Sequence, residues 1–212
     1  MGRLLLLLGL LTLAGCAFGT DRVNLAGVPS IAMPADGPTT RLEVRDARAE
    51  LSGATVGFKR NGYGAKTGSV ELTNKQPLVD RVRSDMISIL RERGYRAGSD
   101  ESTAELRCDA EILSFIVDVK QGFWSGSLEG LSAVRVTISE QETGRQVWSD
   151  VVRGEYDKTG LQFVSGGDNQ EVAEKLYANL MTNMRAAIPD MRGRSSPQTG
   201  RSPWSTDTSP KV

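Results

Sequence analysis

The segment AELRCDAEILSFIVDV, residues 104–119, decides the fold. Its first half alternates apolar and polar residues, and residues 112–117 are apolar on both faces. This pattern is typical of a central strand that is covered on both sides. Two more strands are predicted to follow, over residues 130–142 and 146–156, and Gly144 between them supplies the positive φ of a hairpin turn.

An amphipathic helix is predicted on either side of these strands. The first begins at Pro77 and ends before Gly94, and its apolar residues recur at helical spacing. The second is expected to have Asp168 as its N-cap and to end before Pro189. One alternating strand is expected over residues 41–46, ahead of the first helix.

The order strand, helix, three strands, helix predicts an α+β fold. We expect a mostly antiparallel sheet with two helices packed on one face. This single domain is predicted to span residues 41–188, with short strand candidates at 54–58 and 69–72. Residues 16–40 hold three prolines and several small residues, which predicts a flexible tether. Residues 189–212 are rich in Pro, Ser, Thr, Arg and Gly, which predicts a disordered tail.

The start of the chain carries the strongest functional signal. A basic residue precedes an apolar run of roughly ten residues, too short for a membrane-spanning helix of roughly 20. Secretory signals have apolar cores of roughly 7 to 15 residues, followed by small residues at the cleavage site. We therefore predict a lipoprotein signal peptide over residues 1–15, recognised at Leu13, Ala14 and Gly15, with lipid on Cys16. An ordinary signal peptide that is cleaved nearby is the alternative.

Lipid on Cys16 would anchor the chain in a membrane. By resemblance to bacterial lipoproteins, its sulfur would carry two acyl chains and its amine a third, such as palmitate. Several chains anchor durably, because each buried methylene contributes roughly 0.8 kcal/mol. Ala17 follows instead of Asp, which favours the periplasmic leaflet of the outer membrane and leaves the inner membrane as an alternative.

Composition excludes several classes of function. The 26 basic and 26 acidic residues cancel, so no net charge favours nucleic acid. The absence of histidine removes Ser-His-Asp and Cys-His catalysis and His-based zinc or haem sites. We predict no enzyme, no metal site and no cofactor. Cys108 alternates with apolar neighbours, which predicts a buried strand position.

Two segments are candidate contact sites for a partner. Phe123 and Trp124 are adjacent aromatics between glycines, which predicts either an interaction surface or aromatic side chains folded back over the sheet edge. A glycine-rich segment holds Lys59, Arg60 and Tyr63, two cations and an aromatic on a predicted exposed loop.

Five segments occur in an order that suggests a known family: residues 13–16, 45–73, 90–95, 104–122 and 169–188. In this order the chain resembles the YajG-like family of bacterial envelope lipoproteins, over roughly residues 16–188. The resemblance implies a lipoprotein of the cell envelope. That family has no assigned activity, so the resemblance implies no catalytic residues.

Three functions remain open. The first is a non-enzymatic binding or accessory role, in which the anchored protein contacts an envelope protein or peptidoglycan. The second is carriage of a small lipid or glycan. The third is carboxylate-based hydrolysis of peptidoglycan by acids such as Asp109 and Glu111, although their alternation on one strand face is typical of solvated positions.

Overall fold

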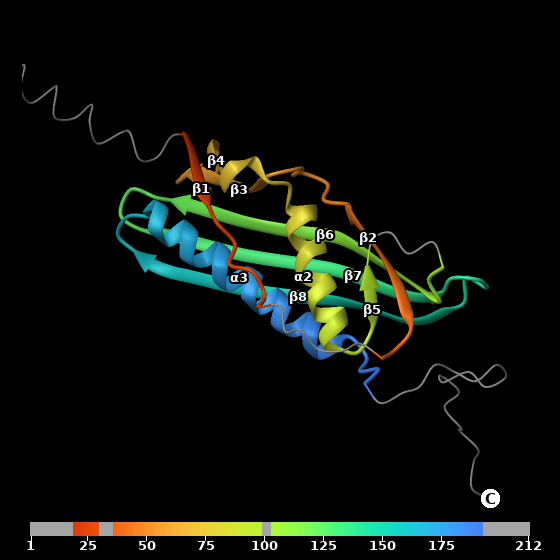
Figure 1. Cartoon of the computed structure of the whole chain (residues 1–212). Helices are drawn as coiled ribbons and strands as arrows, with labels where there is room; N and C mark the ends of the chain where they lie inside the picture. Colours follow the sequence, from red (N-terminus) through yellow and green to blue (C-terminus); the bar gives the residue numbers. More distant parts are fainter. Residues whose placement is uncertain (1–18, 30–35, 99–102, 193–212) are drawn as a thin grey trace, which may run out of the picture.

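A computed structural model describes residues 19–29, 36–98 and 103–192 of the chain (Figure 1). These residues form one α+β domain, which confirms the predicted fold class. The elements in order are β1 (Gly19–Val23), β2 (Thr39–Asp46), β3 (Thr55–Asn61), β4 (Lys66–Leu72), the 3-10 turn η1 (Thr73–Lys75), α2 (Leu78–Glu92), β5 (Arg96–Gly98), β6 (Leu106–Gln121), β7 (Gly126–Glu140), β8 (Gln146–Leu161) and α3 (Gly166–Ala187).

The described strands form one mixed sheet with a divided edge. β6, β7 and β8 make an antiparallel meander with the longest pairings. β2 and β3 both run parallel to β6, with β2 along its first half and β3 along its last five residues. A register shift between Ile112 and Ser114 lies where β2 departs. Such a bulge bends a strand, so β2 with β5 and β3 with β4 and β1 form separate branches beside β6.

Both helices cover the same face of the sheet (Figure 1). α3 packs along β7 and β8, and α2 packs across β2. Buried positions of β6 alternate up to Ile112 and resume at Phe115, because the bulge shifts the alternation. Leu113 and Ile116 point the other way and are partly exposed. The prediction that this segment is covered on both faces is therefore wrong, and its continuous apolar run reflects the bulge.

The helix boundaries largely confirm the sequence pattern, with one exception. α2 follows Pro77 directly, and Gly94 closes it with a φ of 91°. The N-cap of α3 is Ser165, not Asp168 as predicted. Asp168 instead accepts a 2.8 Å hydrogen bond from the Ser165 backbone N–H, while its own N–H donates to the Ser165 hydroxyl at 3.2 Å. This reciprocal capping box satisfies two free N–H groups at the helix start.

The described part of the predicted tether, residues 19–29 and 36–40, packs on the domain. β1 pairs in parallel with β4, beginning with Gly19 opposite Gly68. Val23 and Leu25 are buried in the core beneath this pairing. The sequence GTDRV carries little of the alternation that marks a strand, so β1 was missed, and the domain extends to Gly19.

The start of the predicted tail also packs on the domain. Met191 is buried, and its backbone N–H donates a 2.7 Å hydrogen bond to the Arg93 carbonyl. The rest of the tail, the signal peptide and Cys16 lie outside the described residues. Within the described ranges, no helix is long and apolar enough to cross a membrane.

Candidate contact surface

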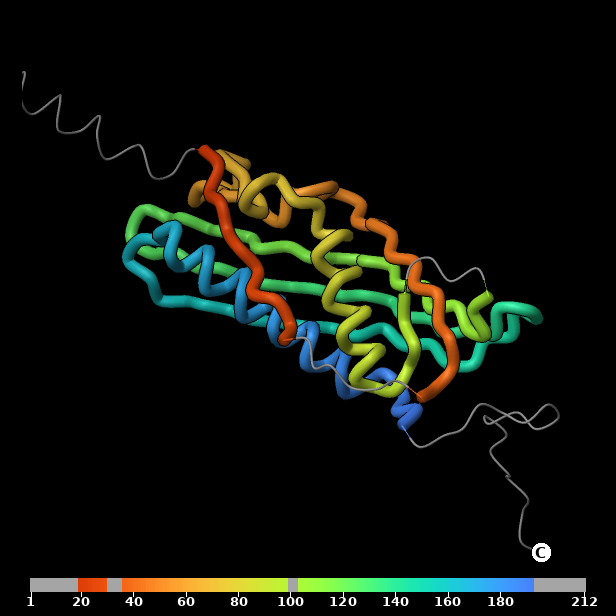
Figure 2. Tube along the Cα trace, viewed as in Figure 1, coloured from red at the N-terminus to blue at the C-terminus, as the bar shows by residue number. Residues whose placement is uncertain are grey.

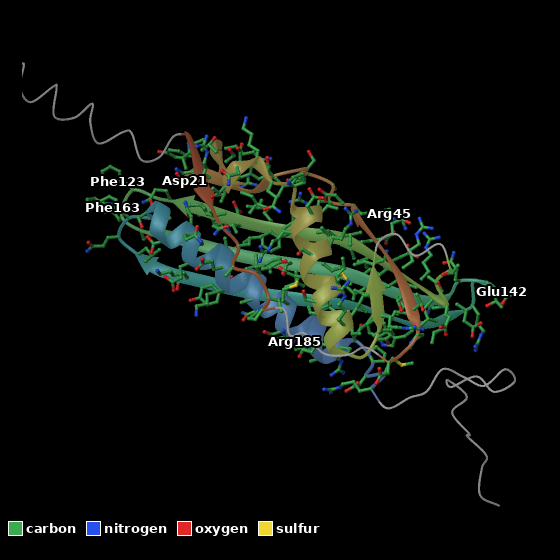
Figure 3. The ribbon with its side chains drawn as sticks, in the orientation of Figure 1. Asp21, Arg45, Phe123, Glu142, Phe163 and Arg185 are labelled. Atoms are coloured by element: carbon green, nitrogen blue, oxygen red, sulfur yellow. The ribbon has the colours of Figure 1, made fainter. Side chains whose placement is uncertain are left out.

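Three connections meet at the end of the sheet where β6 ends. They join β3 to β4, β6 to β7 and β8 to α3, through residues 62–65, 122–125 and 162–165. Figure 3 shows Phe123 and Phe163 together at this end and Glu142 at the opposite one. We call the most exposed aromatic side chains of these turns the aromatic end: Tyr63 (98% exposed), Phe123 (82%), Trp124 (84%) and Phe163 (75%).

The aromatic end surrounds an open hollow of about 970 Å³. All four aromatic residues line it, and Val119 of β6 contributes to its apolar wall. Phe123 and Trp124 contact each other edge to face, with ring centroids 4.6 Å apart and an interplanar angle of 86°. The two rings support each other in solvent, and they do not fold back over the sheet edge.

The turns at the two ends of the sheet differ in their content of charged side chains. Residues 62–65, 122–125 and 162–165 include no charged side chain. At the opposite end, the β7–β8 turn has the sequence QETGR over residues 141–145, and Arg145 forms an ion pair with Glu140. The hydrogen bond from Arg145 holds the pKa of Glu140 below its usual value. The three turns of the aromatic end are thus uncharged, whereas the β7–β8 turn at the opposite end carries Glu142 and Arg145.

The structure places Lys59 and Arg60 differently from the exposed loop that the sequence predicted. Both lie on β3, and Lys59 is only 7% exposed, with its Nζ 3.1 Å from the carboxylate of Asp21 on β1. Arg60 donates a 2.8 Å hydrogen bond from Nε to Asp118 on β6. The two cations therefore join neighbouring strands behind the turns. Of Lys59, Arg60 and Tyr63, only Tyr63 has a largely exposed side chain.

Phe163 is a surface residue that the sequence analysis missed. β8 was predicted to end at residue 156, but it continues to Leu161 and brings Phe163 to the aromatic end. The signal in the sequence was a lone aromatic residue in the uncharged stretch QFVSGG, residues 162–167. Its position beside Phe123 depends on the length of the β7–β8 pairing, which the local sequence does not reveal.

The chain enters the domain beside these turns. β4 begins at the β3–β4 turn, and β1 runs parallel to it from Gly19. Figure 2 shows the first described residues at this end, next to the β3–β4 turn. Residue 16 precedes Gly19 by three residues, which span at most about 11 Å even when fully extended. A group on Cys16 would therefore attach to the chain within about 11 Å of Gly19.

The carboxylates considered for hydrolysis are paired on the open face of the sheet. Asp109 accepts a 3.0 Å hydrogen bond from Arg107, and Glu111 accepts one of 2.8 Å from Arg135. The bond to Asp109 raises the pKa of Arg107. No group of three or more potential metal ligands occurs among the described residues. Neither carboxylate lines the hollow of the aromatic end.

A second charged cluster fastens β8 to the start of α3. Lys158 Nζ lies 2.7 Å from the carboxylates of both Asp168 and Glu171. Hydrogen bonds from Lys158 and Ser165 lower the pKa of Asp168 to about 2, and the two carboxylates raise the pKa of Lys158. General acid–base catalysis needs a pKa near the working pH, so this cluster is suited to holding structure together.

Comparisons with known proteins show likeness only at the level of overall shape. Neither a protein family nor a curated protein matches the chain. A Xanthomonas campestris protein of the DUF330 family is similar at 9% identity and a TM-score of 0.48, covering 78% of this chain and 88% of that one. A protein described only as uncharacterized has 11% identity and a TM-score of 0.42, covering 78% and 98%. The PelC dodecamer from Paraburkholderia phytofirmans has 15% identity and a TM-score of 0.33, covering 76% and 94%. At these values the likenesses carry no argument about function.

Proposed function

We propose that this chain is a lipid-anchored, non-enzymatic protein of the cell envelope whose aromatic end is its contact surface. The observation that carries this proposal is the pairing of Gly19 with Gly68, close to the β3–β4 turn of the aromatic end and three residues after the Leu-Ala-Gly-Cys16 motif. The lipid would sit on the periplasmic leaflet of the outer membrane, as Ala17 favours. Membership of the YajG-like lipoproteins, which the order of the sequence segments suggests, is part of the same proposal, and no family model matches the chain.

The chemistry of the domain supports a binding role over catalysis. The candidate carboxylates Asp109 and Glu111 are engaged by arginines on the open sheet face. Among the described residues that line the hollow of the aromatic end there is no carboxylate and, since the chain has no histidine, no imidazole. Exposed aromatic clusters of this kind are typical of interaction surfaces.

Metabolic labelling tests the lipid anchor. Cells of a Gram-negative host that express the full chain are fed an alkyne-bearing palmitate, and the purified protein is coupled to a fluorophore. We expect label on the wild-type and Cys108→Ser proteins and none on Cys16→Ser. The Cys108→Ser protein is the matched control, because it removes the only other cysteine. Equal labelling of Cys16→Ser and wild type would show that the anchor is elsewhere.

Photocrosslinking in cells tests the contact surface. A photoreactive residue replaces Trp124 in one strain and Glu142, at the opposite end of the sheet, in another. We expect adducts from position 124 and few from position 142. Similar yields of the same adducts from both positions would contradict a contact surface confined to the aromatic end.

Carriage of a lipid is the second candidate function, and the apolar hollow favours it. Its volume of about 970 Å³ is comparable to small-molecule sites, which occupy roughly 300–1,000 Å³. Val164 lines the hollow, so Val164→Trp would fill part of it. If the protein carries lipid, mass spectrometry of organic extracts should show a bound lipid in wild type and less in Val164→Trp. Equal lipid in both would contradict carriage in this hollow.

A further inference from the structure

We propose that the aromatic end docks on the membrane that holds the lipid of Cys16, with its four aromatic side chains in the bilayer interface. The occupant of the contact surface is then the lipid bilayer itself. This proposal rests on the proposed lipid anchor and goes further, because an anchor alone does not require the domain to touch the membrane.

The short distance between anchor and domain is the first support. A flexible tether over residues 17–40 would separate the domain from its anchor by roughly 25–30 Å on average. In the structure the link between anchor and domain is much shorter, because β1 joins the sheet at Gly19 and Val23 is fully buried. Three residues reach at most about 11 Å, whereas the headgroup layer of one leaflet is about 5–7 Å thick. The end of the sheet beside Gly19 is thus held at the membrane surface.

The chemistry of the turns is the second support. Trp and Tyr concentrate at membrane–water interfaces, where an amphipathic ring has one apolar and one hydrated side. The aromatic end combines Trp124 and Tyr63 with two phenylalanines, all at least 75% exposed. Charged side chains are costly to move toward the bilayer core, and none occurs in the three turns.

The charges behind the turns are the third support. Lys66 lies at the start of β4, with its Nζ 3.5 Å from the centroid of the Phe58 ring and 3.8 Å from the carboxylate of Glu50. Lys120, near the end of β6, pairs with Glu129 at 2.7 Å. Both lysines are about half exposed, so their long stems would reach the level of lipid phosphates while the uncharged turns lie deeper. The charged β7–β8 turn would point away from the membrane.

Fluorescence quenching by brominated lipids tests the docking in the full lipidated protein. The probe protein keeps Trp124 and carries Trp148→Phe and Trp204→Phe. The matched control moves the probe to the opposite end, with Glu142→Trp added and Trp124→Phe removing the original indole. Each protein is reconstituted into phosphatidylcholine vesicles in which the acyl chains near the headgroup are brominated, and vesicle flotation confirms anchoring.

The expected result is strong quenching of Trp124, with a blue-shifted emission, and quenching at least several-fold weaker in the Glu142→Trp protein. Flotation with equal, weak quenching of both probes would overturn the docking and leave the anchor standing. Failure of the wild-type protein to float would overturn the proposed anchor instead. Crosslinks in cells from position 124 to a single protein, or to peptidoglycan, without lipid adducts would also overturn the docking.

A charged substitution in a neighbouring turn provides a second measurement. Phe163→Asp places a carboxylate among the aromatic side chains without touching the core, because Phe163 is 75% exposed. We expect quenching of Trp124 to fall several-fold in this variant, while far-UV circular dichroism and thermal melting stay unchanged. Gln141→Asp adds the same charge at the opposite end and should leave the quenching of Trp124 as it was. Equal quenching of Trp124 in the two variants would contradict insertion of the aromatic end.

Discussion

The hydroxyl of Tyr177 on α3 donates a 2.6 Å hydrogen bond to the carboxylate of Asp85 on α2. Asp85 also accepts hydrogen bonds from the Val28 backbone N–H at 3.1 Å and from Arg81 Nε at 3.0 Å. One buried carboxylate thus joins both helices to the segment that follows β1. Burial, together with the charge of Asp85, raises the pKa of Tyr177, so the phenol remains a donor.

Tyr177→Phe should therefore destabilise the domain by about 1–3 kcal/mol, the usual cost of leaving a buried polar group without its partner. Tyr156→Phe is the matched control, because its hydroxyl bonds the more exposed carboxylate of Glu171 at 3.2 Å. Urea unfolding followed by circular dichroism measures both. An equal decrease in the free energy of unfolding in the two variants would show that burial of the Tyr177–Asp85 hydrogen bond adds nothing to stability.

Gly68→Ala should detach β1 from the sheet. A Cβ at Gly68 would lie 2.0 Å from the carbonyl oxygen of Gly19, closer than any real contact. Gly166→Ala is the control, because its Cβ would meet nothing within 4 Å. Trypsin should then cleave after Arg22 much faster in Gly68→Ala than in wild type or the control. Unchanged cleavage of Gly68→Ala would contradict the β1–β4 pairing and the short link between anchor and domain.

Stability at acid pH should depend on the Lys158–Asp168 pair. The folded-state pKa of Asp168 is lowered to about 2 from an ordinary value of 3.8, chiefly by its hydrogen bond from Lys158. A carboxyl group whose pKa is lower in the folded state stabilises that state at pH values above the unfolded-state pKa. This stabilisation is lost as the pH falls toward the folded-state pKa. The free energy of unfolding should thus decrease between pH 3.8 and about 2.

Lys158→Gln should reduce that acid-dependent loss, because Asp168 then titrates closer to its ordinary value. Lys175→Gln removes an exposed lysine from α3, the helix that carries Asp168. This variant should retain the wild-type dependence of stability on pH. Urea titrations at several pH values from 5 downward give the comparison. Parallel pH profiles for Lys158→Gln and wild type would refute the coupling.

Cys108 should be inert to thiol reagents in the folded protein. It is fully buried on β6, and burial raises its pKa to about 12, whereas the thiolate is the reactive form. In the Cys16→Ser protein, Ellman's reagent should detect no thiol until urea unfolds the chain, and one thiol per chain afterwards. Rapid reaction of the folded protein would mean that β6 is accessible in a way the core packing forbids.

The sequence predictions succeeded where an element depends on interactions within one segment, and they failed where it depends on contacts between distant segments. α2 and the β6–β8 meander were predicted because their apolar periodicity and turns are local properties. β1 and β5 were missed because they have five and three residues, and both pair in parallel with strands distant in the chain. Short segments of this kind form strands because their partner strands hold them, and their own sequence carries little strand signal.

The residues of the candidate site also differ in whether the local sequence could predict them. Phe123 and Trp124 were identified from the sequence because two aromatics between glycines are a local signal. Lys59 and Arg60 were predicted on an exposed loop, but β1 and β6 supply the carboxylates that hold them on β3. Phe163 was missed because nothing near it in the sequence shows that β8 extends to the aromatic end.

The sequence by itself determined the α+β class, the two helices, the meander and the buried position of Cys108, since each depends on side-chain periodicity within one segment. The tertiary structure alone decided that β1 enters the sheet near the β3–β4 turn, which carries Tyr63, and that Phe123 and Phe163 line the same hollow as Tyr63. That meeting depends on the parallel pairing of β1 with β4 and on the lengths of β3, β6 and β8. Pairings between distant strands follow from the packing of the whole sheet, and no single segment encodes them.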